Sequence, residues 1–358
     1  MNIFLLVYTA FLFLIFIGII FISFYKDKDE EIEENGSYNP KTLIIVPVKG
    51  LDLKLKENIL SLKNQNYSNY DLIAVVDSKE DPAVKILEEL GVKYIISDNR
   101  GKGSGKVKAI ATALEKFKNY EVYVLADSDI YAPENWLKQL IKPLSSRKIG
   151  ISTTFPLFIP IDGFWSKLKL VWGLVGQRLM ESRISRFGWG GSLAFRKDLI
   201  DDEFIENFRN CLSDDIEITR RCKKLKLQIY YVDKVLPIVY SKENFKSFIE
   251  WSNRQTALTV MAYHKIFVYG FIYYFMNILL FLSSIVLSIL VNIFYLVFLL
   301  PTLFNSIKNY LKINGKYLSI IFISLFINFI YFYNLIKAKR MKYIKWRGNI
   351  YRLSQYNE

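Results

Sequence analysis

The chain has 358 residues, enough for one large domain or two ordinary ones, and a net charge of +14 from 48 basic and 34 acidic side chains. Two cysteines, Cys211 and Cys222, give neither a disulfide framework nor a metal-knuckle spacing, and one histidine, His264, excludes a histidine-based triad or a histidine-rich zinc site. The positive charge suits anionic membrane surfaces, phosphorylated substrates or nucleic acid, and the hydrophobic segments described next favour the membrane, so we expect no nucleic acid partner.

Apolar residues make up 52% of the chain and are concentrated at its two ends. Residues 1–24 carry no charge and are long enough to cross a bilayer. We expect a retained transmembrane anchor, because the basic start and the small-residue cleavage site of a signal peptide are missing. Residues 261–336 form a second hydrophobic block. Within this block, the charge-free stretch 266–307 would be about 63 Å long as a helix, which is enough to cross the bilayer twice. Residues 317–336 would cross it once more.

This arrangement predicts an integral, multi-pass protein of the cell membrane. The positive-inside rule favours a cytoplasmic location for the polar domain. Three crossings in the block would carry the basic tail, residues 337–358, to the far side. Either one of the two to three expected helices lies along the interface, which we favour, or the tail breaks the rule.

A charged linker, 25–39, leads into a polar domain expected over residues 40–260. In this domain short apolar runs alternate with helical patterns, which predicts βαβ units and a parallel sheet whose strand ends lie on one edge. The first four expected strands are 42–46, 71–76, 92–96 and 122–126. Aromatic residues interspersed with lysines over about 155–187 are typical of a segment at the membrane interface, although a soluble protein would bury such a run.

Polar residues follow several of these strands. Pro47 begins a Pro-Val-Lys-Gly turn, Asp77 follows the second strand, and Asp127 and Asp129 form a D-x-D after the fourth. Ligands of open α/β sheets bind at such strand ends, and two acids two residues apart can hold one hard divalent cation. Each aspartate alone is equally consistent with capping a turn.

Three later motifs add to this pattern. Glycines and lysines over 100–108 precede a helix and suit phosphate binding, but the spacing is not that of a Walker loop, and a flexible basic loop is the alternative. Gly190 and Gly191 permit close approach of the backbone to a ligand. Asp214 and Asp215 begin a helix, where acids are favoured by the helix dipole and where one can also serve as a general base.

In this order the motifs resemble those of the family 2-type inverting glycosyltransferases of GT-A fold, and within them the membrane-bound ceramide glucosyltransferase-like branch. The resemblance covers about residues 40–260 together with Trp346, Arg347, Gly348 and Tyr351 in the tail. It implies an α/β fold with a doubly wound mixed sheet and with transmembrane helices at both ends.

The resemblance also implies roles for individual residues. Asp77 and Asp81 match the nucleotide-base contact, and Asp215 matches the base that acts on the acceptor hydroxyl. Asp127 and Asp129 match the D-x-D that binds Mn²⁺ or Mg²⁺ on the donor diphosphate, with Asp129 favoured as the direct ligand. The remaining donor-binding residues are Pro47 and Lys106. The expected acceptor- or sugar-binding residues are Gly190, Gly191, Asp214, Trp251, Arg254 and Gln255.

The last of these motifs departs from the family pattern, Gln/Arg-x-x-Arg-Trp. Here Trp251 stands in place of Gln or Arg, and Gln255 in place of Trp, while Arg254 is kept. The departure concerns the acceptor geometry and leaves the reaction class unchanged.

The expected activity is transfer of a hexose from a nucleotide-diphosphate sugar, a UDP- or GDP-sugar, to a lipid acceptor by a metal-dependent, membrane-bound enzyme of glycolipid synthesis. Two alternatives within the enzymes are a polyprenyl-phosphate glycosyltransferase and a polysaccharide synthase. The non-enzyme alternative is a membrane scaffold that binds nucleotide or lipid.

Overall fold

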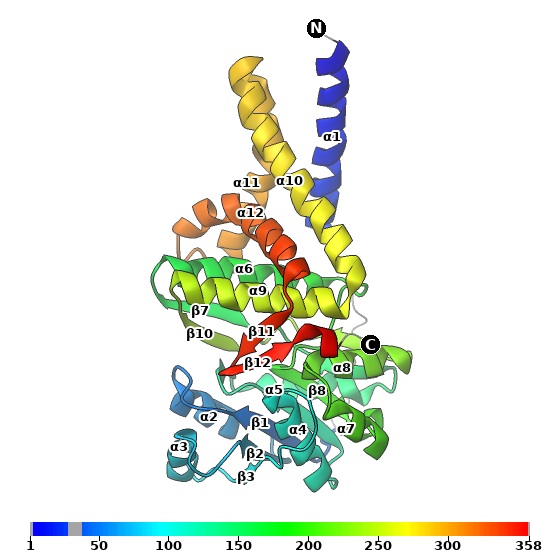
Figure 1. The fold of residues 1–358 in the computed structure, drawn as a ribbon, viewed down its shortest axis with the longest axis vertical. Helices are drawn as coiled ribbons and strands as arrows, with labels where there is room; N and C mark the ends of the chain where they lie inside the picture. The colour runs from blue at the N-terminus through cyan, green and yellow to red at the C-terminus, as the bar shows by residue number, and fades with distance from the viewer. Residues whose placement is uncertain (1–2, 28–37, 357–358) are drawn as a thin grey trace.

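The computed structural model describes residues 3–27 and 38–356, so most of the expected linker over 25–39 lies outside the described residues (Figure 1). The domain after the linker is built on a seven-stranded sheet of order β3-β2-β1-β4-β8-β6-β9. In chain order the strands are β1 (Thr42–Val48), β2 (Tyr70–Val76), β3 (Tyr94–Ile96), β4 (Val122–Ala126), β6 (Ile149–Thr153), β8 (Ser192–Arg196) and β9 (Gln228–Tyr231).

The sheet is mixed and mostly parallel, as expected. Strands β1 to β4 run parallel to one another, and β8 is antiparallel to both of its neighbours, β4 and β6. All four strands predicted first are present, and β4 has the predicted limits. Strands β4, β6 and β8 are buried at every position, because helices cover both faces of the sheet.

Two groups of helices form these outer layers. On one face lie α2 (Leu55–Lys63), α3 (Ala83–Glu89) and α5 (Trp136–Ile141). On the other lie α4 (Gly105–Lys116), α7 (Asp202–Phe208) and α8 (Asp214–Lys224). Helix α4 begins four residues earlier than predicted, because the Ser104 hydroxyl caps it by accepting the N–H of Val107.

A second, smaller sheet and two long helices separate this core from the apolar helices. The sheet is β5 (Ile130–Tyr131), β10 (Ile238–Lys242) and β7 (Leu157–Asp162), and α6 (Phe164–Glu181) and α9 (Phe245–Ala262) lie side by side above it (Figure 1). The aromatic run at 155–187 forms β7 and α6. A Cβ at Gly173 or Gly176 would lie within 2.3 Å of the Phe158 or Phe155 ring, so these glycines let both rings pack against α6. The position of the 155–187 segment at a membrane interface remains a prediction.

In the described part of the chain, three helices are long and apolar enough to cross a membrane: α1 (Ile3–Phe24), the Lys265–Leu290 part of α10 (His264–Leu290) and α12 (Ser319–Arg340). Helices α1 and α10 project from the body, whereas α12 packs on α6 and α9 (Figure 1). The stretch 266–307, expected to cross twice, holds α10 and then a shorter return through η3 (Ile293–Leu299) and α11 (Leu300–Lys312). How many of these segments cross stays a prediction.

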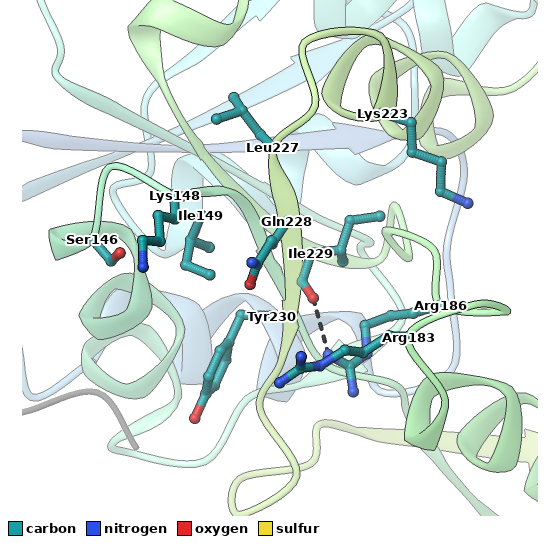
Figure 2. A pocket seen from close by; sticks show the side chains of 10 residues that line it. All are labelled: Ser146, Lys148, Ile149, Arg183, Arg186, Lys223, Leu227, Gln228, Ile229 and Tyr230. Carbon is teal, nitrogen blue, oxygen red and sulfur yellow. Dashed lines mark hydrogen bonds between the residues drawn. The ribbon is translucent and has the colours of Figure 1, made fainter. Parts of the chain in front are cut away.

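The edge strand β9 is joined to the end of α6 by a buried arginine (Figure 2). Arg186 donates from Nε to the Met180 carbonyl at 2.8 Å and from Nη1 to the Ile229 carbonyl at 3.0 Å. A cavity of about 240 Å³ at this junction is also lined by Lys148 and Lys223. None of the residues predicted to bind substrate lines it.

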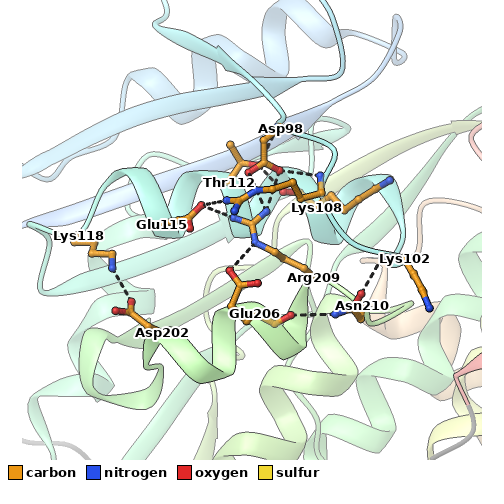
Figure 3. Close-up of polar contacts among 11 residues, drawn as sticks. Asp98, Lys102, Lys108, Thr112, Glu115, Lys118, Asp202, Glu206, Arg209 and Asn210 are labelled. Atoms are coloured by element: carbon orange, nitrogen blue, oxygen red, sulfur yellow. Dashed lines mark hydrogen bonds and ion pairs between the residues drawn. The ribbon is translucent and has the colours of Figure 1, made fainter.

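The glycine- and lysine-rich loop is clasped to the segment that precedes α8 (Figure 3). The N–H of Gly103 donates to the Arg209 carbonyl at 2.9 Å, and that of Ser104 to the Cys211 carbonyl at 3.0 Å. A Cβ at Gly103 would lie 2.4 Å from the Cys211 oxygen, so glycine is required there. These two amides are already bonded, which argues against the alternative of a flexible loop, and the phosphate role stays a prediction.

Arg209 fixes this clasp from the inside. Its guanidinium, 2% exposed, binds Asp98 at 2.9 Å and Glu115 of α4 at 2.5 Å. The start of α4 and the start of α8, which carry predicted donor-side and acceptor-side residues, are therefore held in one rigid unit.

Candidate active site

A cleft of about 440 Å³ opens where β1, β2 and β4 end. Its size is that of a small-molecule site, and its place is the one at which α/β sheets bind ligands. The structure brings all but one of the predicted site residues to its walls. Those lining it are Pro47, Asp77, Lys106, Asp127, Asp129, Gly190, Gly191, Asp214, Asp215, Trp251, Arg254 and Gln255.

Asp81 is the exception, because it does not line the cleft. Its two carboxylate oxygens accept the N–H of Gly50 at 3.1 and 3.0 Å, and one of them accepts the N–H of Ala83 at 2.9 Å. Asp81 thus ties the turn after β1 to the start of α3. Asp77, in contrast, lines the cleft and forms an ion pair with Lys49 at 2.8 Å.

The D-x-D is a tight turn between β4 and β5. The N–H of Ile130 donates to the Asp127 carbonyl at 3.3 Å, and the hydroxyl of the middle residue, Ser128, donates to Asp52 at 2.6 Å. Asp127 and Asp129 both line the cleft. Burial, followed by the charges of Asp127 and Asp52, raises the pKa of Asp129 to about 7.

Lys106 lies between the two halves of the site. Its Nζ is 2.7 Å from Asp127 of the D-x-D and 3.2 Å from Asp214 of α8. Burial alone lowers its pKa, but the two carboxylates raise the pKa of Lys106 above its ordinary value. Burial raises the pKa of Asp214 to about 6, against the opposing effect of Lys106. One ammonium group thus balances two acids at the wall of the cleft.

Gly190 and Gly191 make room for these acids. A Cβ at Gly190 would lie 2.1 Å from Oδ2 of Asp214, and one at Gly191 would lie 2.7 Å from Oδ2 of Asp127 and 2.3 Å from the Trp189 ring. The two glycines line the cleft as predicted, and the structure adds a reason for them that does not involve a ligand.

Asp215 is the more accessible of the paired acids. Its Oδ1 accepts the N–H of Ile216 at 2.8 Å and the hydroxyl of Ser213. Among the described residues, no hydrogen bond to Oδ2 is found, so this oxygen is available to an incoming hydroxyl. A carboxylate held by two donors through one oxygen has the geometry of a positioned general base.

Aromatic rings form the wall toward the membrane helices. Trp251 packs at 4.7 Å from Trp172 and 5.3 Å from Phe158, and Lys169 lies 4.6 Å above the Trp251 ring. Burial lowers the pKa of Arg254, one helical turn further along α9, to about 10.

Tyr263 and Asp52 were not singled out from the sequence, whereas Arg347 belongs to the tail segment that the family resemblance includes. Tyr263, between α9 and α10, lines the cleft, and its buried hydroxyl has no hydrogen-bond partner among the described residues. Asp52 and Arg347 form an ion pair at 2.6 Å beside the D-x-D. An alternation of apolar and polar residues carries no signal for Tyr263 or Asp52.

The chemistry of the donor set fits a hard divalent cation, although no group of three or more histidine, cysteine or acidic side chains with metal-binding geometry occurs in the part of the chain that the structure describes. Asp127 and Asp129 offer carboxylate oxygens two residues apart, which Mg²⁺ and Mn²⁺ prefer. A carboxyl whose ionised form is disfavoured by burial and by neighbouring acids, as in Asp129, would be stabilised by such a cation.

Comparison with known proteins agrees with the geometry. The chain matches glycosyl transferase family 21 over residues 8–358. It is 27% identical to ceramide glucosyltransferase 3 of Caenorhabditis elegans over 155 residues, 41% of this chain and 34% of that protein. It is 29% identical to the ceramide glucosyltransferase of Candida albicans over 151 residues, 36% of this chain and 26% of that protein. The chain thus spans about a third or less of these relatives.

Among solved structures, the mannosyltransferase PcManGT from Pyrobaculum calidifontis, in complex with GDP-Man and Mn²⁺, superposes with a TM-score of 0.56 at 15% identity. The match covers 92% of this chain and 95% of that one. At this identity the likeness shows the fold alone, and it agrees with the expected GT-A type of sheet.

Lys106→Met should lower the free energy of unfolding by about 3–5 kcal/mol at pH 8, because Asp214 would be left buried and unpaired. The loss should shrink at pH 5, since protonation removes the charge of an acid whose pKa is raised in the folded state. Denaturant unfolding of the solubilised protein in EDTA measures both values. The control is Lys116→Met, on the exposed side of α4; an equal effect of the two substitutions would contradict the assigned role.

Proposed function

Since this chain belongs to glycosyl transferase family 21, we propose that it is an inverting glycosyltransferase that moves a hexose from a UDP- or GDP-sugar to a lipid acceptor. The proposal rests on one observation: two sets of acidic side chains face the same cleft from opposite sides. The D-x-D and Lys106 form one side, and the free oxygen of Asp215 forms the other. The names of the relatives, two ceramide glucosyltransferases, support a lipid acceptor.

In the proposed reaction each of these residues has a separate role. Asp215 removes the proton of the acceptor hydroxyl as that oxygen attacks the anomeric carbon, and Lys106 offsets negative charge near the leaving diphosphate. A Mn²⁺ or Mg²⁺ ion held by Asp127 and Asp129 would neutralise diphosphate oxygens when bound. A single base without an enzyme nucleophile gives one displacement, and therefore inversion at the anomeric carbon.

The far end of the cleft suits an apolar acceptor. Its lining passes from Leu179 of α6 and Leu258 and Ala262 of α9 to Ile266, at the start of a candidate membrane span. A lipid whose chains remain in the bilayer can enter along these residues and present its hydroxyl to Asp215. Tyr263 lies on this route, and its unpartnered hydroxyl offers a hydrogen bond to the acceptor head.

We further propose that the protein is embedded in the cell membrane with the folded domain in the cytoplasm. The basic residues that end α12, Lys337, Lys339 and Arg340, support this orientation by the positive-inside rule. A donor made in the cytoplasm then reaches the cleft directly.

Asp215→Asn should lower kcat by about 10²–10⁴-fold, because the amide cannot accept the acceptor proton. Transfer of radiolabelled hexose from UDP- and GDP-sugars to lipid is measured in inverted vesicles, which expose the cytoplasmic face. Glu217→Gln, on the same helix but outside the cleft, serves as the control. No transfer by the wild type from any donor, or equal transfer by Asp215→Asn, would overturn the proposal, as would activity confined to right-side-out vesicles.

Chelation with EDTA should abolish transfer, and added Mn²⁺ or Mg²⁺ should restore it, because the two D-x-D carboxylates cannot by themselves screen a diphosphate. Asp129→Asn should raise the Mn²⁺ concentration for half-maximal activity by at least tenfold. Undiminished activity in EDTA would count against Asp127 and Asp129 as metal ligands. Asp81→Asn, which alters a carboxylate outside the cleft, should leave the metal requirement unchanged.

Tyr263→Phe should raise the acceptor KM by about five- to tenfold, the value of one hydrogen bond, and leave the donor KM unchanged. Stability should not fall, because the hydroxyl has no partner within the described protein. Tyr269→Phe, at an exposed position of α10, is the matched control. An unchanged acceptor KM in Tyr263→Phe would remove this residue from the acceptor site.

A further inference from the structure

The carboxyl-terminal segment folds back onto the catalytic domain as a β-hairpin of β11 (Tyr343–Trp346) and β12 (Asn349–Arg352). Ile344 and Leu353 are buried in one cluster with Leu212, just ahead of the Asp214–Asp215 pair, and with Leu258 of α9. The Arg254 guanidinium lies 6.0 Å from the Trp346 ring. The hairpin is therefore anchored on the acceptor side of the cleft.

From this anchor the hairpin reaches across to the donor side. Arg347, in the turn, binds Asp52 through Nη2 at 2.6 Å, next to the D-x-D. The Tyr351 hydroxyl accepts the N–H of Gly105, the first residue of α4, at 3.3 Å. Tyr356 donates to the Lys102 carbonyl at 2.8 Å. Three contacts that span more than 240 positions of sequence thus join the chain end to the donor half of the site.

The hairpin also forms the wall of a second cavity. This cavity, of about 480 Å³, adjoins the catalytic cleft and is lined mainly by polar side chains. On one side lie Asp77 and Asn99, which follow β2 and β3, and on the other lie Asn349, Tyr351 and Gln355 of the tail. Asp77, Asn349 and Tyr351 line both cavities, so the two spaces meet beneath the hairpin.

We propose that the carboxyl-terminal hairpin is part of the donor site: it closes the nucleoside pocket, and Arg347 binds the diphosphate of the nucleotide. The inference rests on the proposed function, since it assigns the two adjoining cavities to the two halves of one donor. The nucleoside fills the polar cavity, the sugar enters the cleft that contains Asp215, and the diphosphate lies at the junction between them.

The charges at the junction favour this placement. Lys49 pairs with Asp77, Lys106 pairs with Asp127 and Asp214, and Arg347 pairs with Asp52, and all three cations line the cleft. Arg347 uses only Nη2 for Asp52, and the contact of its Nη1 with the Lys49 carbonyl is long, at 3.4 Å. With its side chain 43% exposed, the guanidinium keeps donors for a phosphate, the anion that its fork geometry matches.

The test is the binding of UDP and of GDP to the full-length, solubilised protein in MnCl₂, measured by isothermal titration calorimetry without acceptor. Arg347→Ala should weaken the Kd by about tenfold or more, the effect of losing a charge-assisted hydrogen bond. Arg347→Lys should recover part of the lost affinity, because lysine keeps the positive charge but lacks the paired N–H donors of the guanidinium group. Tyr351→Phe, which removes one tie between the hairpin and Gly105, should weaken the Kd severalfold.

Arg352→Ala is the matched control, since it removes an exposed arginine from the same hairpin outside both cavities, and its Kd should stay within twofold of the wild type. Wild-type binding that persists unchanged in Arg347→Ala and in Tyr351→Phe would overturn the role of the hairpin and leave the proposed function standing. Failure of the wild type to bind either nucleotide would overturn both. Equal weakening in Arg352→Ala would show a general charge effect and also overturn the inference.

Discussion

The site depends on one buried cation. Lys106 lies between Asp127, at the end of β4, and Asp214, at the start of α8, and the residues around it are shaped to keep it there. The buried carboxylate of Asp214 and the partly buried one of Asp127 would repel each other without the ammonium group, and the ammonium group would be costly to bury without them. Gly190 and Gly191 leave room for the acids, and the clasp around Arg209 fixes α4 against the segment that leads into α8. Donor and acceptor halves are therefore one electrostatic unit.

A second connection runs from the membrane side. Helices α6 and α9 lie beneath α12 and carry the aromatic wall of the cleft, while the chain continues from α12 directly into the hairpin that crosses the donor side. The tail thus passes from a candidate membrane span to the proposed nucleotide pocket within a few residues, anchored by the buried side chains of Ile344 and Leu353.

Much of this site was predictable, because its main residues follow local patterns. A continuous apolar run that ends in acids marks both a strand and its functional end, so β1, β2, β4 and the D-x-D could be found from sequence. Asp52 and Tyr263 could not, and Arg347 was found only through the family resemblance, since their places depend on contacts between positions far apart in the chain. The order within the glycine-rich loop could not be predicted for the same reason: the amides of Gly103 and Ser104 are bonded to the carbonyls of Arg209 and Cys211, while residues of the loop line both cavities. Short strands such as β5 depend on their partners and carry no periodic signal of their own.

The adjacent acids Asp214 and Asp215 illustrate why a motif alone does not assign a base. Successive residues at the start of a helix point in different directions, so Asp214 faces the core and Lys106 while Asp215 faces the cleft. Asp214 is 1% exposed and engaged with the ammonium group, and its raised pKa reflects burial rather than access to substrate. Asp215 is held by Ser213 and by the N–H of Ile216 through a single oxygen, which leaves the other toward the acceptor. The environments separate the two carboxyls into a buried acid paired with Lys106 and an accessible one that fits the proposed base, and Lys106 also pairs with Asp127 on the proposed donor side.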